Sequence, residues 1–269
     1  MLFAPDPGGP VPVDFQGRVF YNWIGLNRRT NREERAQADM GITKTDFMRG
    51  MQCRKMLWLD KHRPGLRVIP PEIQARLDAG NDFGDRAMGM FGPFEEMTVY
   101  RPGTRIPDKK KMAEKTKEHL QAGTPVICEA AFLDYNNYCA ADLLRKTDRG
   151  YDLYEVKNAP EVRDQFIRDA GFQLYLIQRC GVRIGKVYIV IHGPDEENPF
   201  VPVEVTEEAR ALVPWVNEHI WDLNRMQKEK EEPVQECGEQ CTCPYECWYY
   251  AYCRGENRRP EQLAMDGIG

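Results

Sequence analysis

The sequence lacks several features that would assign it to a membrane, secreted or strongly basic class of protein. None of its apolar runs approaches the roughly 20 residues that a membrane-spanning helix needs. The first residues, MLFAPDPGGPVPVDF, have neither a basic start nor a sustained apolar stretch, so they do not resemble a signal peptide. The formal net charge of −5 does not favour binding to nucleic acid, but an acidic protein can still have a basic groove on its surface. We therefore expect a cytoplasmic protein that binds no membrane.

Cysteine, in contrast, is plentiful and unevenly spread. The chain has nine cysteines, and five of them crowd into one short segment, namely Cys237, Cys241, Cys243, Cys247 and Cys253. Disulfide frameworks are rare in a reducing compartment, where a cysteine cluster usually indicates a metal or iron–sulfur site. The other four residues are Cys53, Cys128, Cys139 and Cys180.

The pattern of periodic and irregular segments predicts four parts. These are a loosely ordered extension (1–40), a helical part that carries Cys53 (41–125), a core of strands and helices (126–232) and a segment with clustered cysteines (233–269). A capping box at Thr43 to Asp46 predicts one continuous helix from about Thr45 to Leu59, with Cys53 inside it. Helices, a block of strands and then helix–strand–helix indicate an α/β domain on one central sheet. The N-terminal helix and the C-terminal tail are expected to form a lobe beside it.

The most informative stretch for chemistry is AADLLRKTDRGYDLYEVKNAP. Two strand-like runs flank a turn, and a hairpin folded about Asp148 and Arg149 places Asp142 opposite Glu155. Two carboxylates that close repel each other unless a cation such as Mg²⁺ or Mn²⁺ lies between them. Lys157 shares the strand face of Glu155 because side chains alternate. A three-residue loop would shift the register, and an ordinary exposed hairpin is the alternative interpretation of the whole stretch.

These residues resemble the PD-(D/E)XK nuclease superfamily in its RecB-like branch. The following helix supplies Gln173 at the family's glutamine position, although Ala141 precedes Asp142 where the family has proline. The family's early-helix histidine is also missing, since Gly84 stands there. The resemblance implies a restriction-endonuclease-like mixed sheet flanked by helices. It implies catalysis by Asp142, Glu155, Lys157 and Gln173, and metal ligation by Asp142, Glu155 and the Val156 carbonyl, with Glu129 as a further candidate.

The cysteines resemble a second feature of this branch. The stretch from Thr43 to Leu59 and the C-terminal cysteines are similar to those of the CRISPR-associated iron–sulfur exonucleases and of a related bacterial family of unknown function. The resemblance implies a 4Fe–4S cluster, with zinc as the alternative. Its ligands would be Cys53, Cys241, Cys247 and Cys253, with Cys243 as an alternative to Cys241.

The sequence thus predicts a Mg²⁺- or Mn²⁺-dependent deoxyribonuclease, in particular an exonuclease acting on DNA with single-stranded ends. Protein partners in DNA repair, phage biology or CRISPR-type defence would fit such an enzyme. The rival hypothesis is a non-catalytic nucleic-acid- or protein-binding module with the same fold and a structural metal site. The presence of Asp142, Glu155 and Lys157 together favours the enzyme.

Overall fold

A six-stranded mixed sheet organises residues 41–255, which are the residues that the computed structural model describes. The prediction for residues 1–40 lies outside this range, as does that for the end of the cysteine segment, 256–269. The strands follow one another in chain order: β1 (Glu95–Glu96), β2 (Val126–Asp134), β3 (Asn137–Thr147), β4 (Gly150–Val156), β5 (Ile184–His192) and β6 (Phe200–Glu204). The pairs β1–β2 and β4–β5 are parallel, and the other three are antiparallel. An α/β architecture on one central sheet is therefore confirmed.

The β3–β4 hairpin has the register that the sequence predicts. Thr147 pairs with Gly150 across a two-residue turn, and the ladder runs back to the pair Leu143 and Tyr154. Gly150 has a φ of 120°, which a glycine adopts without strain. The two-residue turn excludes the shifted register that a three-residue loop would have produced.

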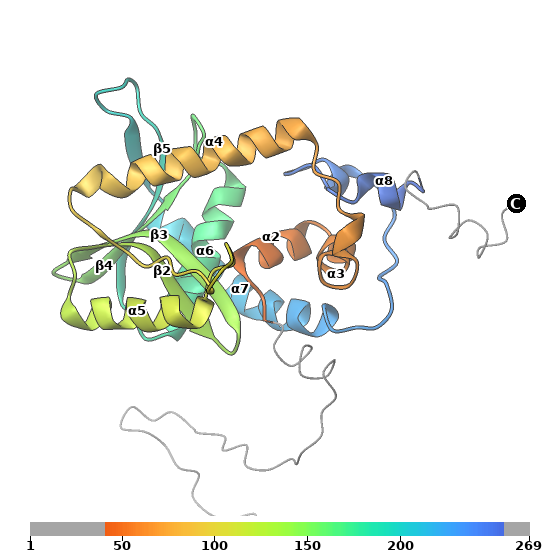
Figure 1. Cartoon of the computed structure of the whole chain (residues 1–269), viewed down its shortest axis with the longest axis horizontal. Helices are drawn as coiled ribbons and strands as arrows, with labels where there is room; N and C mark the ends of the chain where they lie inside the picture. The colour runs from red at the N-terminus through yellow and green to blue at the C-terminus, as the bar shows by residue number, and fades with distance from the viewer. Residues whose placement is uncertain (1–40, 256–269) are drawn as a thin grey trace, which may run out of the picture. The chain divides into compact units, whose positions relative to one another are not determined.

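Helices pack against the sheet and contribute residues to its core (Figure 1). They are α2 (Lys44–Gln52), α3 (Arg54–His62), α4 (Pro71–Ala87), α5 (Lys109–Ala122), α6 (Asp164–Arg179), α7 (Thr206–Met226) and the short α8 (Tyr250–Cys253). α6 packs across β2 to β5, and α7 packs on α6. The ring of Phe47 on α2 lies 5.0 Å from that of Phe172 on α6 and joins α2 to the same core.

The N-terminal helical segment differs from the prediction of one continuous helix. It breaks at Cys53, whose extended backbone (φ −157°, ψ 116°) ends α2 and precedes α3. The capping box at the start of α2 is confirmed, since Oγ1 of Thr43 accepts from the Asp46 N–H and Oδ2 of Asp46 accepts from the Thr43 N–H. Helical periodicity continues through the break, so the sequence gives no sign that Cys53 leaves the helix.

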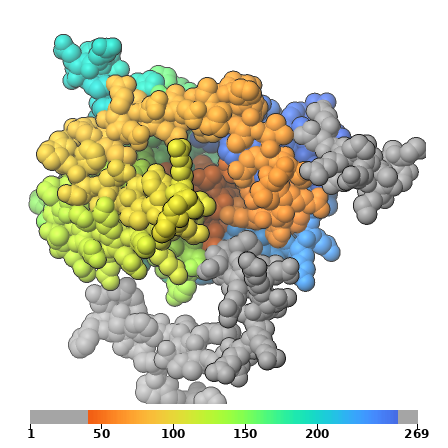
Figure 2. Space-filling view, viewed as in Figure 1, coloured from red at the N-terminus to blue at the C-terminus, as the bar shows by residue number. Residues whose placement is uncertain are grey.

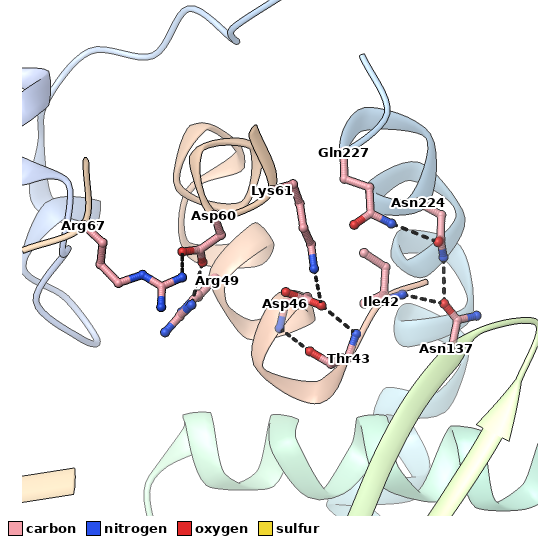
Figure 3. A network of polar contacts seen from close by, with 10 residues as sticks. All are labelled: Ile42, Thr43, Asp46, Arg49, Asp60, Lys61, Arg67, Asn137, Asn224 and Gln227. Carbon is pink, nitrogen blue, oxygen red and sulfur yellow. Dashed lines mark hydrogen bonds and ion pairs between the residues drawn. The ribbon is translucent and has the colours of Figure 1, made fainter. Parts of the chain in front are cut away.

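Polar contacts fix α2 and α3 to each other and to the sheet (Figure 3). Lys61 pairs with Asp46 at 2.7 Å, and the Ile42 N–H donates to Oδ1 of Asn137 at the start of β3. The cysteine segment packs against α3, because the phenol of Tyr249 donates to Oδ1 of Asp60 at 2.7 Å. Segments almost two hundred residues apart in sequence thus lie together. No helix among residues 41–255 is long and apolar enough to cross a membrane.

Candidate active site

Asp142 and Glu155 occupy the positions that directly continue the β3–β4 ladder after Leu143 and Tyr154. Opposed residues of an antiparallel pair share one face of the sheet, with Cβ atoms about 4.5–5.5 Å apart. Glu155 is 1% exposed, and Oδ2 of Asp142 accepts a hydrogen bond from the Val156 N–H at 2.7 Å. The hairpin therefore brings together the two carboxylates that the sequence predicts to act as a pair. Val156 contributes its N–H to this contact, and metal ligation by its carbonyl stays a prediction.

Two lysines approach the same oxygen of Glu155. Nζ of Lys157 lies 2.7 Å from Oε1, and Nζ of Lys44 lies 2.8 Å from it. Lys157 comes from the end of β4, as predicted, whereas Lys44 is the first residue of α2. Lys157 also forms an ion pair with Oδ2 of Asp169 on α6, so it bridges two carboxylates.

Helix α6 contributes the fourth predicted residue, Gln173. Its Nε2 donates to Oε2 of Glu155, the oxygen that the lysines leave free. Gln173 follows Asp169 by four residues, and this helical spacing puts both side chains on one face. Gln173 is fully buried, and its Oε1 has no hydrogen-bond partner among the described residues. Tyr175 lies apart, with its hydroxyl bonded to Asn217 on α7.

Burial and nearby charges shift the pKa values of the two carboxyl groups in opposite directions. Burial and the negative charge of Glu155 raise the pKa of Asp142 to about 7. Burial also raises the pKa of Glu155, but the charges of Lys157 and Lys44 outweigh it and lower this pKa to about 2. Burial lowers the pKa of Lys157, while the charges of Asp169 and Glu155 raise it well above its usual value. Near neutral pH, the site therefore holds one ionised carboxylate and one that gives up its proton readily.

Glu129 lies at the same level of the neighbouring strand β2. The pairs Cys128–Leu143 and Ala130–Ala141 are formed on either side of it, which places Glu129 opposite Asp142. Its φ of 53° is uncommon for a residue other than glycine and is typical of strained functional positions. Burial raises the pKa of Glu129, the charge of Lys44 lowers it, and that of Glu155 raises it. Glu129 thus belongs to the electrostatic environment of the pair, and its role as a metal ligand stays a prediction.

The four preferred cluster cysteines pack into one hydrophobic region. Cys241 and Cys247 are buried there, and Cys53 and Cys253 are partly buried against the same core. Burial raises the pKa of the Cys247 thiol to about 11, and negative charge on Cys53, Cys253 or Cys241 acts in the same direction. Electrostatic coupling of this kind requires the thiols to be close together. The fold thus brings one thiol from the N-terminal part to three from the C-terminal segment.

The structure also separates the two alternatives for the third ligand. Cys241 is 7% exposed inside the cysteine region, whereas Cys243 is exposed. Cys237 has no role in the sequence-based prediction, but it lies beside Cys241. Burial raises the pKa of the Cys237 thiol, and the charge of Cys241 and a hydrogen bond with Cys241 raise it further. A fifth thiol therefore accompanies the four preferred ones.

Helix α2 runs from the carboxylates to the cysteines. Lys44 at its first position contacts Glu155, and Cys53 directly follows its last position, Gln52. Nε2 of Gln52 donates to the carbonyls of Gln240 (2.8 Å) and Tyr245 (2.6 Å) in the cysteine segment. Burial raises the pKa of the Tyr245 phenol, and the negative charge of Asp169 raises it further. The cysteine segment therefore borders the carboxylate site, although the two are far apart in sequence.

Sequence reasoning missed Lys44, Asp169 and Cys237. The capping box marked the helix start that carries Lys44, but nothing local shows that this lysine reaches β4. The spacing of Asp169 to Gln173 is a signal that could have been used, because residues four apart on a helix share a face.

Neither a scan of known protein families nor a search of curated proteins finds a match to this chain. Among residues 41–255, no group of three or more His, Cys, Asp or Glu side chains is placed so that it could hold a metal ion. The assignment of a function therefore depends on the chemistry of the two sites.

Proposed function

We propose that this chain is a Mg²⁺- or Mn²⁺-dependent deoxyribonuclease of the PD-(D/E)XK type, with a restriction-endonuclease-like core of the RecB-like branch. The observation that carries the proposal is the convergence of Asp142, Lys157 and Gln173 on Glu155 in the predicted hairpin register. A pair of carboxylates in which loss of solvent, and then the charge of the partner, raises one pKa to about 7 is typical of a site that takes up a cation or a proton.

The oxygen donors at the site are of the kind that a hard divalent cation prefers, although no three acidic side chains among residues 41–255 are placed to hold one in the arrangement described. Asp142, Glu155 and Glu129 offer carboxylate oxygens, which Mg²⁺ and Mn²⁺ prefer. Gln173 has a buried Oε1 without a hydrogen-bond partner in the described part of the chain, and a water molecule in the hydration shell of such a cation would satisfy it. When bound, the cation would act as a Lewis acid toward a phosphate oxygen and a water.

The remaining residues have roles that their contacts suggest. Lys157, held by Asp169, is positioned to neutralise charge on a phosphate at the carboxylate pair. Gln173 holds Oε2 of Glu155 and thereby orients that carboxylate. The basic segment before and at the start of α5 contains Arg101, Arg105 and Lys109 to Lys111 and would attract a nucleic-acid backbone.

A hollow in the surface is an argument that the substrate is a DNA strand with a free single-stranded end. Figure 2 shows it between the golden helix α4, the yellow segment at the start of α5 and the red-brown helix α2. α2 also carries the lysine that contacts Glu155. A strand that has to pass between elements on several sides enters most easily from an end, which favours exonuclease action.

The cysteine region is proposed to hold a 4Fe–4S cluster in a lobe formed by α2, α3 and the C-terminal segment, with zinc as the alternative. Cys53, Cys241, Cys247 and Cys253 would be the ligands, because negative charge on the other three acts on the Cys247 thiol and Cys243 is exposed. Four thiolates suit either iron–sulfur or zinc. None of the nine cysteines, all of which lie within residues 41–255, is paired in a disulfide, so each is available as a ligand.

A cleavage assay tests the proposed activity. The protein should shorten end-labelled single-stranded DNA in Mn²⁺ or Mg²⁺ and not in a chelator, and Lys157→Ala should abolish the shortening while Mn²⁺ binding, measured by calorimetry, persists. Lys186→Met is the matched control, since Lys186 pairs with Glu204 near the start of β5, whereas Glu155 lies beside a later part of that strand. DNA binding without cleavage by the wild-type protein would instead support a non-catalytic binding module.

A further inference from the structure

Lys44 and Lys157 share one oxygen of Glu155 but differ in their second partner. Lys157 also pairs with Asp169, so its ammonium contacts two carboxylates. For Lys44, in contrast, Glu155 is the only carboxylate in ion-pair contact among residues 41–255. A divalent cation bound through Glu155 would compete with both ammonium groups for the same oxygen. Lys157 would then keep a carboxylate partner, whereas Lys44 would lose its only one.

The backbone of Lys44 is held firmly. The reciprocal capping box closes the turn in which Lys44 lies, and Lys61 pairs with the capping Asp46. Ile42, two residues before Lys44, is bonded to β3 through its N–H, which donates to Asn137 (Figure 3), and through its carbonyl, which accepts from the Tyr138 N–H. Only the flexible side chain of Lys44 can therefore move when its partner changes.

The side chain of Lys44 also has access to the outside. It is 23% exposed, although its ammonium reaches a glutamate that is 1% exposed. Its helix α2 borders the hollow between α4 and the start of α5 (Figure 2). A charged group that spans a buried carboxylate and an open space can pass from one anion to another over a short distance.

We propose that Lys44 is a second substrate-binding lysine of this site, which binds a phosphate of the DNA strand once a cation occupies the carboxylates. The inference rests on the proposed nuclease function and adds a residue to it. Lys157 stays with Asp169 beside the reacting phosphate, and Lys44 leaves Glu155 and forms a charge-assisted hydrogen bond to a phosphate oxygen. Lysine binds phosphate as a compact point charge, which suits this contact.

The test uses the full-length protein and the variants Lys44→Met and Lys44→Arg, with Lys186→Met as the control for loss of a paired lysine elsewhere. Equilibrium binding of a single-stranded oligonucleotide is measured with Ca²⁺ in place of Mn²⁺, at several salt concentrations, and the oligonucleotide is checked for integrity. Single-turnover cleavage is measured in Mn²⁺, and Mn²⁺ binding is measured without DNA.

Loss of one phosphate contact should reduce the slope of log K against log salt concentration by about 0.7 for a single strand. Lys44→Met should show this reduction together with a fall of about 10²–10³-fold in the cleavage rate, which is typical for loss of one charge-stabilising donor. Lys44→Arg should keep the salt slope, and Lys186→Met should keep both quantities. Mn²⁺ binding by Lys44→Met should be unchanged or tighter, because a competitor for Glu155 is gone.

Other outcomes separate the two proposals. If the wild-type protein cleaves DNA and Lys44→Met keeps the wild-type salt slope, Lys44 does not bind the strand. Any loss of cleavage rate in that variant would then come from the lost contact of Lys44 with Glu155 alone. Weaker Mn²⁺ binding by Lys44→Met would likewise overturn the inference, since it would make Lys44 a support for the metal site. If the wild-type protein shows no metal-dependent cleavage, the nuclease proposal itself fails.

Discussion

Replacing Asp142 with asparagine should stabilise the metal-free protein while removing its proposed activity. Asp142 has a pKa raised to about 7, because its half-buried carboxyl group is largely withdrawn from solvent and lies beside the ionised Glu155. Asparagine has nearly the same shape, and its side-chain oxygen can still accept the hydrogen bond from the Val156 N–H. The variant therefore removes one negative charge and little else.

The expected gain follows from the pKa shift. The folded-state pKa of about 7 lies about three units above the ordinary value of 3.8, and each unit corresponds to about 1.36 kcal/mol. Because the folded protein binds this proton more tightly than the unfolded chain, the free energy of unfolding falls as pH rises from about 4 to about 7. Ionising Asp142 thus costs the wild-type protein up to about 4 kcal/mol above pH 7. Glu155 has the opposite shift, with a pKa of about 2, and its contribution is constant above about pH 5.

The assay is denaturant unfolding of both proteins in a chelator at a series of pH values. The difference in unfolding free energy should be near zero at pH 4, grow through pH 5 to 7, and stay constant above that. Adding Mn²⁺ at pH 8 should stabilise the wild-type protein by mass action and leave Asp142→Asn unchanged. A difference that does not depend on pH, or a less stable variant at pH 8, would refute the charge argument.

Two further predictions concern the cysteine lobe and the packing of α2. Cys53→Ser should lower the unfolding free energy by about 3–5 kcal/mol, as for loss of a long-loop cross-link, and should remove the bound iron or zinc found by elemental analysis. It should also reduce the activity of the folded fraction, because α2 carries Lys44. The exposed Cys180→Ser should have none of these effects, and an unchanged unfolding free energy of Cys53→Ser would contradict a cross-link through Cys53. Gly50→Ala should destabilise the protein by about 1–3 kcal/mol, because its Cβ would lie 2.8 Å from a methyl of buried Leu223. Gly80→Ala in α4, with open space around it, should instead stabilise by about 0.5–1 kcal/mol, and equal denaturation midpoints for the two glycine variants would contradict the packing argument.

The sequence by itself determined the hairpin and which of its residues lie opposite one another. A two-residue turn and the alternation of side chains are local properties, so the positions of Asp142, Glu155 and Lys157 on one strand pair could be predicted from spacing alone. The α/β class and the capping box of α2 followed from periodicity and end signals in the same way.

Only the tertiary structure decided which groups from other elements reach that hairpin. Lys44 and Asp169 contact the site because α6 packs against the sheet and α2 packs against α6, and such long-range packing has no local signal in the chain. The break at Cys53 and the burial of Cys241 in place of Cys243 also depend on how α3 meets the C-terminal segment. Local spacing fixes which residues share a face, but the packing of distant elements fixes which charges surround them.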